Sequence, residues 1–460
     1  MQGRSDLEAL RVAVAAGEVD TVVAALVDMQ GRLVGKRFHA EHFLRRGFEE
    51  THCCNYLLAT DMEMLPVPGY RAASWDRGYG DYVMKPDLST LRRVPWLEAT
   101  ALVLCDVLEH DMNEEVPHAP RAVLKRQIAR LEARGMRAMM ASELEFFLFD
   151  VSYDAARSQG YRELRPSNPY NQDYQIFLTT KDEPVMRALR NGLSGAGVPV
   201  ENSKGEASAG QEEINIGYAD ALESADRHVI VKHAAKEIAW AHGKAITFLA
   251  KWSNAAAGSS AHIHQSLWTS AGRPLFRGEG PETGEGPETM ASAMRQYLAG
   301  LLAYAAEGTL FLAPFVNSYK RFVAETFAPT HAVWSNDNRT AGYRTVGLGS
   351  DASRIECRVG GADLNPYLAM AAQIAAGLAG IDAALELEPE FTGNAYRPAQ
   401  PRLIPQNLRA AASALDGSAM FRESLGDTVV DHYVRAARWE QEEYDRTVSD
   451  WDLARGFERA

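Results

Sequence analysis

The segment Ser142-Glu143-Leu144-Glu145-Phe146-Phe147-Leu148-Phe149 decides the fold, because it predicts a strand that also carries chemistry. Its polar and apolar residues alternate before an aromatic run, which is typical of a β-strand, expected here over 138–150. Residues at i and i+2 of a strand share a face, so Glu143 and Glu145 lie side by side. Two such carboxylates repel unless a cation or protons lie between them. A divalent-metal site is one interpretation of this segment, and a half-exposed strand face is the other.

Two further segments add metal-ligand chemistry. In Gly205-Glu-Ala-Ser-Ala-Gly-Gln-Glu-Glu213, the acids Glu206 and Glu213 bracket a turn of small residues; a surface loop is the alternative. In Gly258-Ser-Ser-Ala-His-Ile-His-Gln-Ser266, the side chains of His262 and His264 project from one side of a predicted strand. Imidazoles alone would suit Zn²⁺, or would be hydrogen-bonded in a core or surface. The excess of carboxylates favours Mg²⁺ or Mn²⁺ instead.

A fourth segment, Arg354-Ile-Glu-Cys-Arg358, alternates basic and acidic side chains on one strand face. A cross-strand ladder of salt bridges would explain this pattern. The alternative places Glu356 on a metal and the guanidinium groups on phosphate, which arginine binds in a bidentate manner. Further arginines at 321, 339 and 344 support a phosphate site. The chain contains no GxxxxGK[ST] or GxGxxG motif, so the pattern favours metal-assisted phosphoryl chemistry on an antiparallel sheet.

Periodicity along the chain predicts an organisation in which short strands alternate with long helices. An N-terminal region combines a helix with a strand hairpin, and a polar stretch at 109–118 separates it from the rest. The expected helices cover 5–16, 117–134, 219–242 and 292–307; the expected strands cover 21–27, 32–37, 102–107, 138–150 and 353–359. The Ala-rich stretches 297–316 and 368–385 contain charged or polar residues and are expected to be core helices.

Composition limits the class of protein. With 46% hydrophobic and 24% charged residues among 460, the chain is expected to be globular. A formal net charge of −13 argues against nucleic acid and against an anionic membrane as partners. Four cysteines are too sparse for a disulfide framework, and no targeting segment is visible. We therefore expect a cytoplasmic location.

Taken together and in order, these motifs resemble the glutamine synthetase family. Other matching stretches are Asp28–Arg37, Met84–Thr90, Asn317–Arg321, Trp334–Arg339 and Asn365–Tyr367, so the resemblance covers nearly the whole chain. It implies an α+β subunit with a small β-grasp domain at 1–110 and a large catalytic domain at 111–460 containing a curved antiparallel sheet. It also implies a ring-shaped homo-oligomer, a dodecamer of two hexameric rings, with each site formed between neighbouring subunits.

The resemblance also implies roles for individual residues. One divalent ion, Mg²⁺ or Mn²⁺, would be held by Glu145, Glu206 and Glu213, and a second by Glu143, His262 and Glu356. Glutamate would bind at Gly258 and Arg321, with Arg358 near its activated end. The ATP phosphates would meet Arg339 and Arg344, and His264 with Ser266 would line the nucleotide side. In the family's reaction, ATP phosphorylates the γ-carboxylate of L-glutamate, and an amine then displaces phosphate.

The sequence departs from true glutamine synthetases where they bind ammonium. Their flap loop carries a glutamate, but here Phe327 stands at that position, and Glu325 lies two residues earlier. The segment Phe48–Tyr56 also lacks the family's aspartate for ammonium. A phenyl ring favours an organic amine, gaining about 0.8 kcal/mol for each buried CH₂. We therefore predict an ATP-dependent ligase that joins glutamate to an organic amine. An ordinary glutamine synthetase, a catalytically silent scaffold and an amine-independent kinase are the alternatives.

Overall fold

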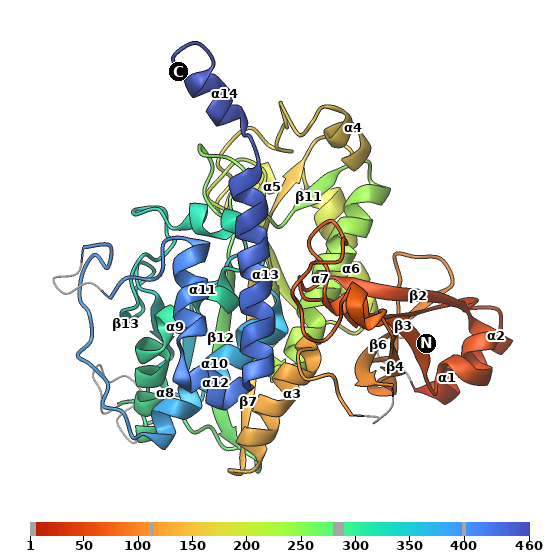
Figure 1. Cartoon of the computed structure of the whole chain (residues 1–460), viewed down its shortest axis with the longest axis horizontal. Coiled ribbons are helices and arrows are strands. Elements are labelled where there is room, and N and C mark those ends of the chain that lie inside the picture. Colours follow the sequence, from red (N-terminus) through yellow and green to blue (C-terminus); the bar gives the residue numbers. More distant parts are fainter. Residues whose placement is uncertain (1–5, 111–113, 279–288, 398–401) are drawn as a thin grey trace.

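The computed structural model describes residues 6–110, 114–278, 289–397 and 402–460, and two β-sheets dominate it (Figure 1). The N-terminal sheet has the strand order β2-β1-β6-β4-β3, with β5 added beside β6. Its strands are β1 (Thr21–Val27), β2 (Leu33–His39), β3 (Thr51–Cys54), β4 (Asp81–Pro86), β5 (Arg92–Arg93) and β6 (Thr100–Glu109). The strand β1 runs parallel to β6, and all other pairs are antiparallel. The strands predicted at 21–27, 32–37 and 102–107 are confirmed.

Local chemistry explains the β1–β2 hairpin. The Asp28 carboxylate accepts hydrogen bonds from the backbone N–H groups of Gln30 and Arg32 at 3.0 and 2.8 Å, and so forms the turn. Gly31 adopts the left-handed conformation, with φ of 77°, which a glycine tolerates without strain.

Helical elements accompany the N-terminal sheet, and α1 adds Leu10 and Ala13 to its core. The predicted N-terminal helix is confirmed as α1 (Leu7–Ala15), where the Asp6 side chain caps the first turn by accepting from Ala9 N at 2.8 Å. The other elements are α2 (Ala40–His42), a π-helical turn (Phe43–Gly47) and three 3₁₀ turns (Asn55–Leu58, Trp75–Arg77 and Leu88–Thr90). The predicted domain boundary at 110/111 adjoins residues 111–113, which lie outside the described residues, and it stays a prediction.

The larger sheet carries the candidate site. Its order is β13-β14-β15-β12-β7-β9-β8, with β10 and β11 also paired to β7. The strands are β7 (Met136–Phe149), β8 (Val200–Gly205), β9 (Gln211–Ile216), β10 (Ala219–Asp220), β11 (Ala245–Thr247), β12 (Ala261–Thr269), β13 (Trp334–Asn336), β14 (Tyr343–Val346) and β15 (Arg354–Cys357). The sheet is antiparallel except for β13 and β14, which are parallel. The strands predicted at 138–150 and 353–359 are confirmed.

Helices pack against this sheet and against one another (Figure 1). They are α3 (Pro120–Glu132), α4 (Tyr153–Ser158), α5 (Ile176–Thr179), α6 (Glu183–Gly195), α7 (Ala221–Ala241), α8 (Ser292–Ala303), α9 (Ala305–Leu312), α10 (Pro366–Asp382), α11 (Leu408–Asp416), α12 (Ala419–Leu425), α13 (Asp427–Arg446) and α14 (Asp450–Gly456), with a 3₁₀ turn at Val316–Arg321. The helix α10 is almost wholly buried among α3, α7, α8, α9 and α12. In the described part of the chain, none of the helices is both long and apolar enough to traverse a bilayer.

One predicted helix was wrong in its extent. The pattern over 292–307 predicted a single helix, but the chain leaves the helical conformation at Tyr304, where φ is −105° and ψ is 14°, and α9 begins at Ala305. The apolar residues continue across the break, with Leu302 and Ala305 both buried, so periodicity could not reveal it.

Alternation along β7 separates the core from the candidate site. Leu144 and Phe146 point into the main hydrophobic core that β7 shares with α7. Glu143 and Glu145 therefore lie on the opposite face. The two sheets are also linked by Arg121 of α3, which pairs with Asp87 and Asp106 of the N-terminal region and with Asp226 of α7. This buried network stabilises the position of the N-terminal sheet against the larger one.

Candidate active site

Strand register brings carboxylates and an imidazole together on the face of the larger sheet opposite the main core. Glu143 of β7 lies directly opposite His262 of β12, and Glu145 of β7 lies opposite Glu213 of β9. Side chains of directly paired residues project to the same face. Residues predicted from three separate motifs therefore converge, although the motifs lie far apart in the sequence.

The first group, the carboxylate cage, consists of Glu145, Glu206 and Glu213. One oxygen from each lies within 4.8 Å of the others. The Ser260 hydroxyl and backbone N–H donate to the Glu145 carboxylate at 2.6 and 2.9 Å and fix its orientation. Burial and the charge of Glu206 raise the pKa of Glu145, and burial and the charge of Glu143 raise the pKa of Glu213. Buried carboxylates that repel one another in this way suit a divalent cation.

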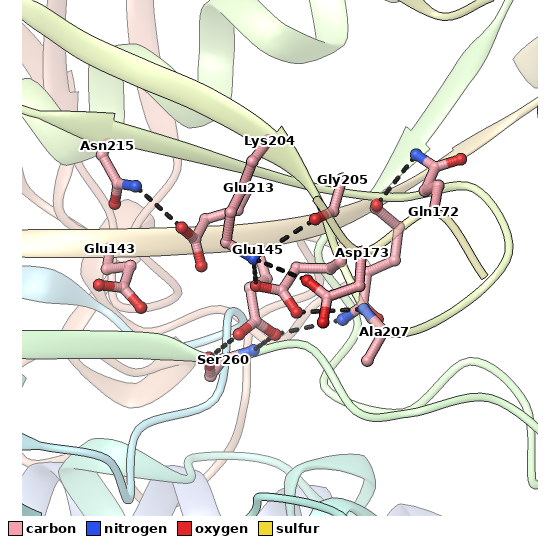
Figure 2. Close-up of polar contacts among 12 residues, drawn as sticks. Glu143, Glu145, Gln172, Asp173, Lys204, Gly205, Ala207, Glu213, Asn215 and Ser260 are labelled. Carbon is pink, nitrogen blue, oxygen red and sulfur yellow. Dashed lines mark hydrogen bonds and ion pairs between the residues drawn. The ribbon is translucent and has the colours of Figure 1, made fainter. Parts of the chain in front are cut away.

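Lys204 of β8 lies against the carboxylate cage (Figure 2). Its ammonium group contacts Glu206 and lies 3.3 Å from both the Asp173 carboxylate and the Gly205 carbonyl oxygen. It also lies 4.4 Å from the centre of the Tyr174 ring. Burial disfavours the charged form of Lys204, but Glu213 and Glu206 raise its pKa and keep the ammonium group protonated.

The second group, the histidine cluster, consists of Glu143, His262, His264 and Glu356. His262 Nδ1 lies 3.0 Å from Glu143 and 3.3 Å from Glu356, and His264 Nε2 lies 3.3 Å from Glu143. Ligand atoms of Glu143, His264 and Glu356 all lie within 4.8 Å of one another. Burial and the nearby Arg358 charge lower the pKa of His262, so its neutral ring has a lone pair available. The cluster suits a second cation, and which histidine would ligate it stays a prediction.

Two arginines meet the buried carboxylate of Glu356. Arg344 Nη1 donates to it at 3.0 Å, and Arg358 Nη1 donates to its other oxygen. Although burial acts to raise it, the charge of Arg358 lowers the pKa of Glu356. Among the described residues, Arg358 Nε is a buried donor without a hydrogen-bond partner. A buried donor of this kind is suited to an anionic ligand.

Gly258 and Arg321 pack together at the base of the site. The Arg321 guanidinium is buried and donates to the carbonyl oxygens of Val359 and Arg358 at 2.9 and 3.0 Å. A Cβ on residue 258 would lie 2.4 Å from Arg321 Cγ and 2.9 Å from the Ala250 carbonyl oxygen. Only glycine fits there, and its carbonyl oxygen accepts a hydrogen bond from Gln211 Nε2 at 3.0 Å.

The loop after Arg321 brings an aromatic ring to the same site. Phe327 is 58% exposed and, like Glu325, has a positive φ, at 59° and 64° respectively. Each such conformation costs about 1–3 kcal/mol in a residue with a side chain. The Glu325 carboxylate accepts a hydrogen bond from Arg397 at 2.8 Å. The only carboxylate of this loop is therefore already paired.

Two adjoining cavities divide the predicted residues between them. A cavity of about 890 Å³ is lined by the carboxylate cage, Gly258 and Phe327, together with Arg321, Arg339, Arg344 and Arg358. A second cavity of about 600 Å³ is lined by His264, Ser266, Tyr218, Trp268 and Arg354. Glu143 lines both. The predicted nucleotide residues are thus split: His264 and Ser266 border the second cavity, whereas Arg339 and Arg344 border the first.

Several lining residues were not singled out from the sequence. Tyr218, Trp268 and Lys204 look like ordinary strand or loop residues, and only the fold shows where they lie. One signal was present for Lys204, since it stands two residues before Glu206 on the strand that leads into the cage.

Behind the carboxylate cage lies a second buried acid, Glu212, on the opposite sheet face from Glu213. Gln172 donates to it at 2.6 Å, and burial and the Asp182 charge raise the pKa of Glu212 to about 9. The folded protein therefore keeps this proton at neutral pH, while the unfolded chain loses it near the ordinary glutamate value of about 4.3.

We expect Glu212→Gln to stabilise the protein increasingly with pH. Because the folded state holds the proton more tightly, wild-type stability is greatest below the unfolded pKa and falls as pH rises towards the folded pKa of about 9. Glutamine imitates the protonated acid and removes that loss. The difference in Tm between variant and wild type should grow from pH 5 to pH 8. A difference that stays constant over this range would contradict the protonated state of Glu212.

Known proteins resemble this chain over nearly its whole length. Residues 117–456 match the family model described as glutamine synthetase, catalytic domain. The gamma-glutamylethanolamide synthetase GlnA4 of Streptomyces coelicolor is 46% identical over 98% of this chain and 96% of its own length. The glutamate–isopropylamine ligase of a Pseudomonas species is 36% identical over 95% of each chain. The solved structure titled apo GmaS without ligand superposes with a TM-score of 0.83 at 26% identity, covering 98% of this chain and 99% of that one.

Proposed function

Because the chain belongs to the glutamine synthetase family, we propose that it is an ATP-dependent ligase joining the γ-carboxylate of L-glutamate to an organic amine. The two relatives whose names contain ethanolamide and isopropylamine match nearly the full chain, which supports an organic acceptor. The reaction would proceed through γ-glutamyl phosphate, as the family resemblance implies.

Enzymes of this family use divalent metal ions, and the residues of this chain fit such ions. Mutual repulsion within the carboxylate cage is relieved by a cation, and the histidine cluster offers oxygen and nitrogen ligands. Glu145, Glu206 and Glu213 would hold one ion; Glu143 and Glu356, with His262 as predicted, would hold the other. The many carboxylate oxygens favour Mg²⁺ or Mn²⁺. When bound, these ions neutralise charge on the phosphates of ATP.

The chain's own cations would position the two anionic substrates. We place the glutamate against the Gly258 backbone and the Arg321 guanidinium, with Arg358 Nε donating towards the γ-carboxylate. Arg339 and Arg344 would contact the phosphates, and Tyr218 and Trp268 of the adjoining cavity would pack against the base. Fixed guanidinium groups stabilise the spreading charge of the transferring phosphoryl group.

The proposal that the acceptor is an organic amine rests on one observation. Glu325 is paired with Arg397, whereas Phe327 lines the cavity. Ammonium would need a free carboxylate from this loop, and the loop offers a phenyl ring instead. Two buried CH₂ groups, at about 0.8 kcal/mol each, correspond to about tenfold in favour of a small organic amine.

We therefore expect ethanolamine or isopropylamine to be used at least about tenfold better than ammonium, judged by kcat/KM. Phosphate release with ATP, Mg²⁺ and glutamate should be measured for ammonium, ethanolamine, putrescine, isopropylamine and aniline. Mass spectrometry of each product identifies the amide. Turnover of ammonium that matches or exceeds every organic amine would overturn the proposal.

We also propose that the chain forms a homo-oligomer, a dodecamer of two hexameric rings. Trp451, Leu453 and Phe457 near the C-terminus are 65%, 51% and 84% exposed, and burial against another copy would remove this apolar surface from water. Native mass spectrometry gives the number of subunits directly, and a monomer would contradict the proposal.

A further inference from the structure

The rim of the larger cavity combines two exposed aromatic rings with charged side chains. Tyr174 and Phe327 are 70% and 58% exposed, and both line this cavity together with Asp173, Lys204 and Glu325. In the proposed function, an acceptor tail that extends from the glutamate position towards solvent would pass these residues. Their charges therefore bear on which tails are accepted.

Both exposed carboxylates of the rim already have a cationic partner. The Lys204 ammonium lies 3.3 Å from Asp173, and Figure 2 shows it between Asp173 and the carboxylate cage. On the other side of the cavity, Arg397 pairs with Glu325 at 2.8 Å. No carboxylate that lines this rim, within the parts of the chain that the structure covers, is left to pair with a further ammonium group.

Lys204 also occupies a place that a ligand ammonium would otherwise favour. Two carboxylates, a backbone carbonyl and an aromatic face surround its amino group. These are the groups that bind an alkylammonium ion. The side chain is anchored on β8 and only 19% exposed, so the chain has filled this position with a cation of its own.

The remaining charge of the cavity acts in the same direction. Apart from Lys204, Asp173 and Glu325, six Lys and Arg residues and four Glu residues line it. This balance suits the anionic substrates glutamate and ATP, and it opposes a second positive charge on the acceptor.

We propose that this rim selects monoamines with an uncharged tail, and that Lys204 and Arg397 are specificity-determining residues that exclude diamines and polyamines. The inference rests on the proposed function and deepens it. It does not depend on Phe327, which concerns the choice between ammonium and an organic amine.

The test compares two acceptors of equal length that differ in one charge, 4-amino-1-butanol and putrescine (1,4-diaminobutane). At pH 8 the far end of putrescine is an ammonium group. We expect wild type to prefer the amino alcohol about tenfold or more in kcat/KM, since an uncompensated charge next to fixed cations is strongly disfavoured. Equal use of both acceptors by wild type would overturn the inference.

Variants separate a charge effect from a structural one. Lys204→Gln should reduce the preference about fivefold to tenfold, and Lys204→Arg should preserve it. Arg397→Gln frees the exposed Glu325 carboxylate and should shift the preference towards putrescine; since Arg397 is 78% exposed, folding is not at risk. Lys320→Gln is the matched control, because that lysine lines the cavity but lies 5.3 Å from the Tyr444 ring. We expect its ratio to change less than about twofold.

The outcomes distinguish this inference from the proposed function. Amide formation from both acceptors with an unchanged ratio in Lys204→Gln and Arg397→Gln overturns the inference alone. Failure to form an amide with any organic amine overturns the proposed function, and the inference with it. If Lys204→Gln does not fold, the ratio of kcat/KM for the two acceptors in Arg397→Gln decides whether the inference holds.

Discussion

Replacing Glu213 by glutamine should lower the rate of amide formation by at least about 100-fold. Loss of a residue that only hydrogen-bonds to a metal ligand costs up to about 100-fold, and Glu213 is proposed as a ligand itself. Glu213 is a buried member of the carboxylate cage, and its ionised form would balance the charge of a bound divalent ion. An amide has a similar shape but no charge, so the packing is kept and the cation is held more weakly. Steady-state phosphate release and Mn²⁺ titration calorimetry would measure the two effects.

The adjacent residue supplies the matched control. Glu212 is buried like Glu213, but it lies on the other face of β9 and stays protonated at neutral pH. Glu212→Gln should therefore keep wild-type activity and Mn²⁺ affinity within about twofold, because it removes no charge at pH 7. Equal losses in the two variants would mean that the strand, rather than the carboxylate cage, is being disturbed.

Replacing Gly258 by alanine should lower kcat/KM for glutamate by about 100-fold. The new Cβ would stand 2.4 Å from Arg321 Cγ, so the buried guanidinium must move. A displacement of about 1 Å in a substrate-positioning group is enough to cost about 10²-fold. The loss should show when glutamate is varied at saturating ATP.

Gly80→Ala provides the comparison for this substitution. A Cβ at residue 80 meets no atom within 4 Å, and we expect no change in activity. A folded Gly258→Ala variant with wild-type kinetics for glutamate would remove Gly258 and Arg321 from the proposed glutamate site.

The motifs predicted much of this arrangement because strand alternation is a local property. Glu143 and Glu145 had to share a face once β7 formed, and His262 and His264 likewise. What spacing could not supply is register. Only the pairing of Glu143 with His262 and of His264 with Glu356 shows that the motifs meet.

Other features depend on tertiary packing and carry no local pattern. The break at Tyr304 lies within a largely apolar stretch, and Phe327 has a left-handed backbone although it is not a glycine. The position of Lys204 beside the carboxylate cage follows from the pairing of β8 with β9, which sets it opposite Glu213 and which the sequence does not reveal. The sequence therefore indicated which chemical groups form the site, but it did not indicate the shape of the entrance to the site.

The division of the larger cavity between strands and loops has an evolutionary consequence. Most ligand residues of the carboxylate cage and the histidine cluster stand on central strands, where a change disturbs register and core at once. Asp173, Tyr174, Glu325, Phe327 and Arg397 stand on connecting segments, which tolerate substitution. Selection could thus retune the acceptor of this scaffold by a few loop substitutions while inheriting the phosphoryl-transfer half unchanged.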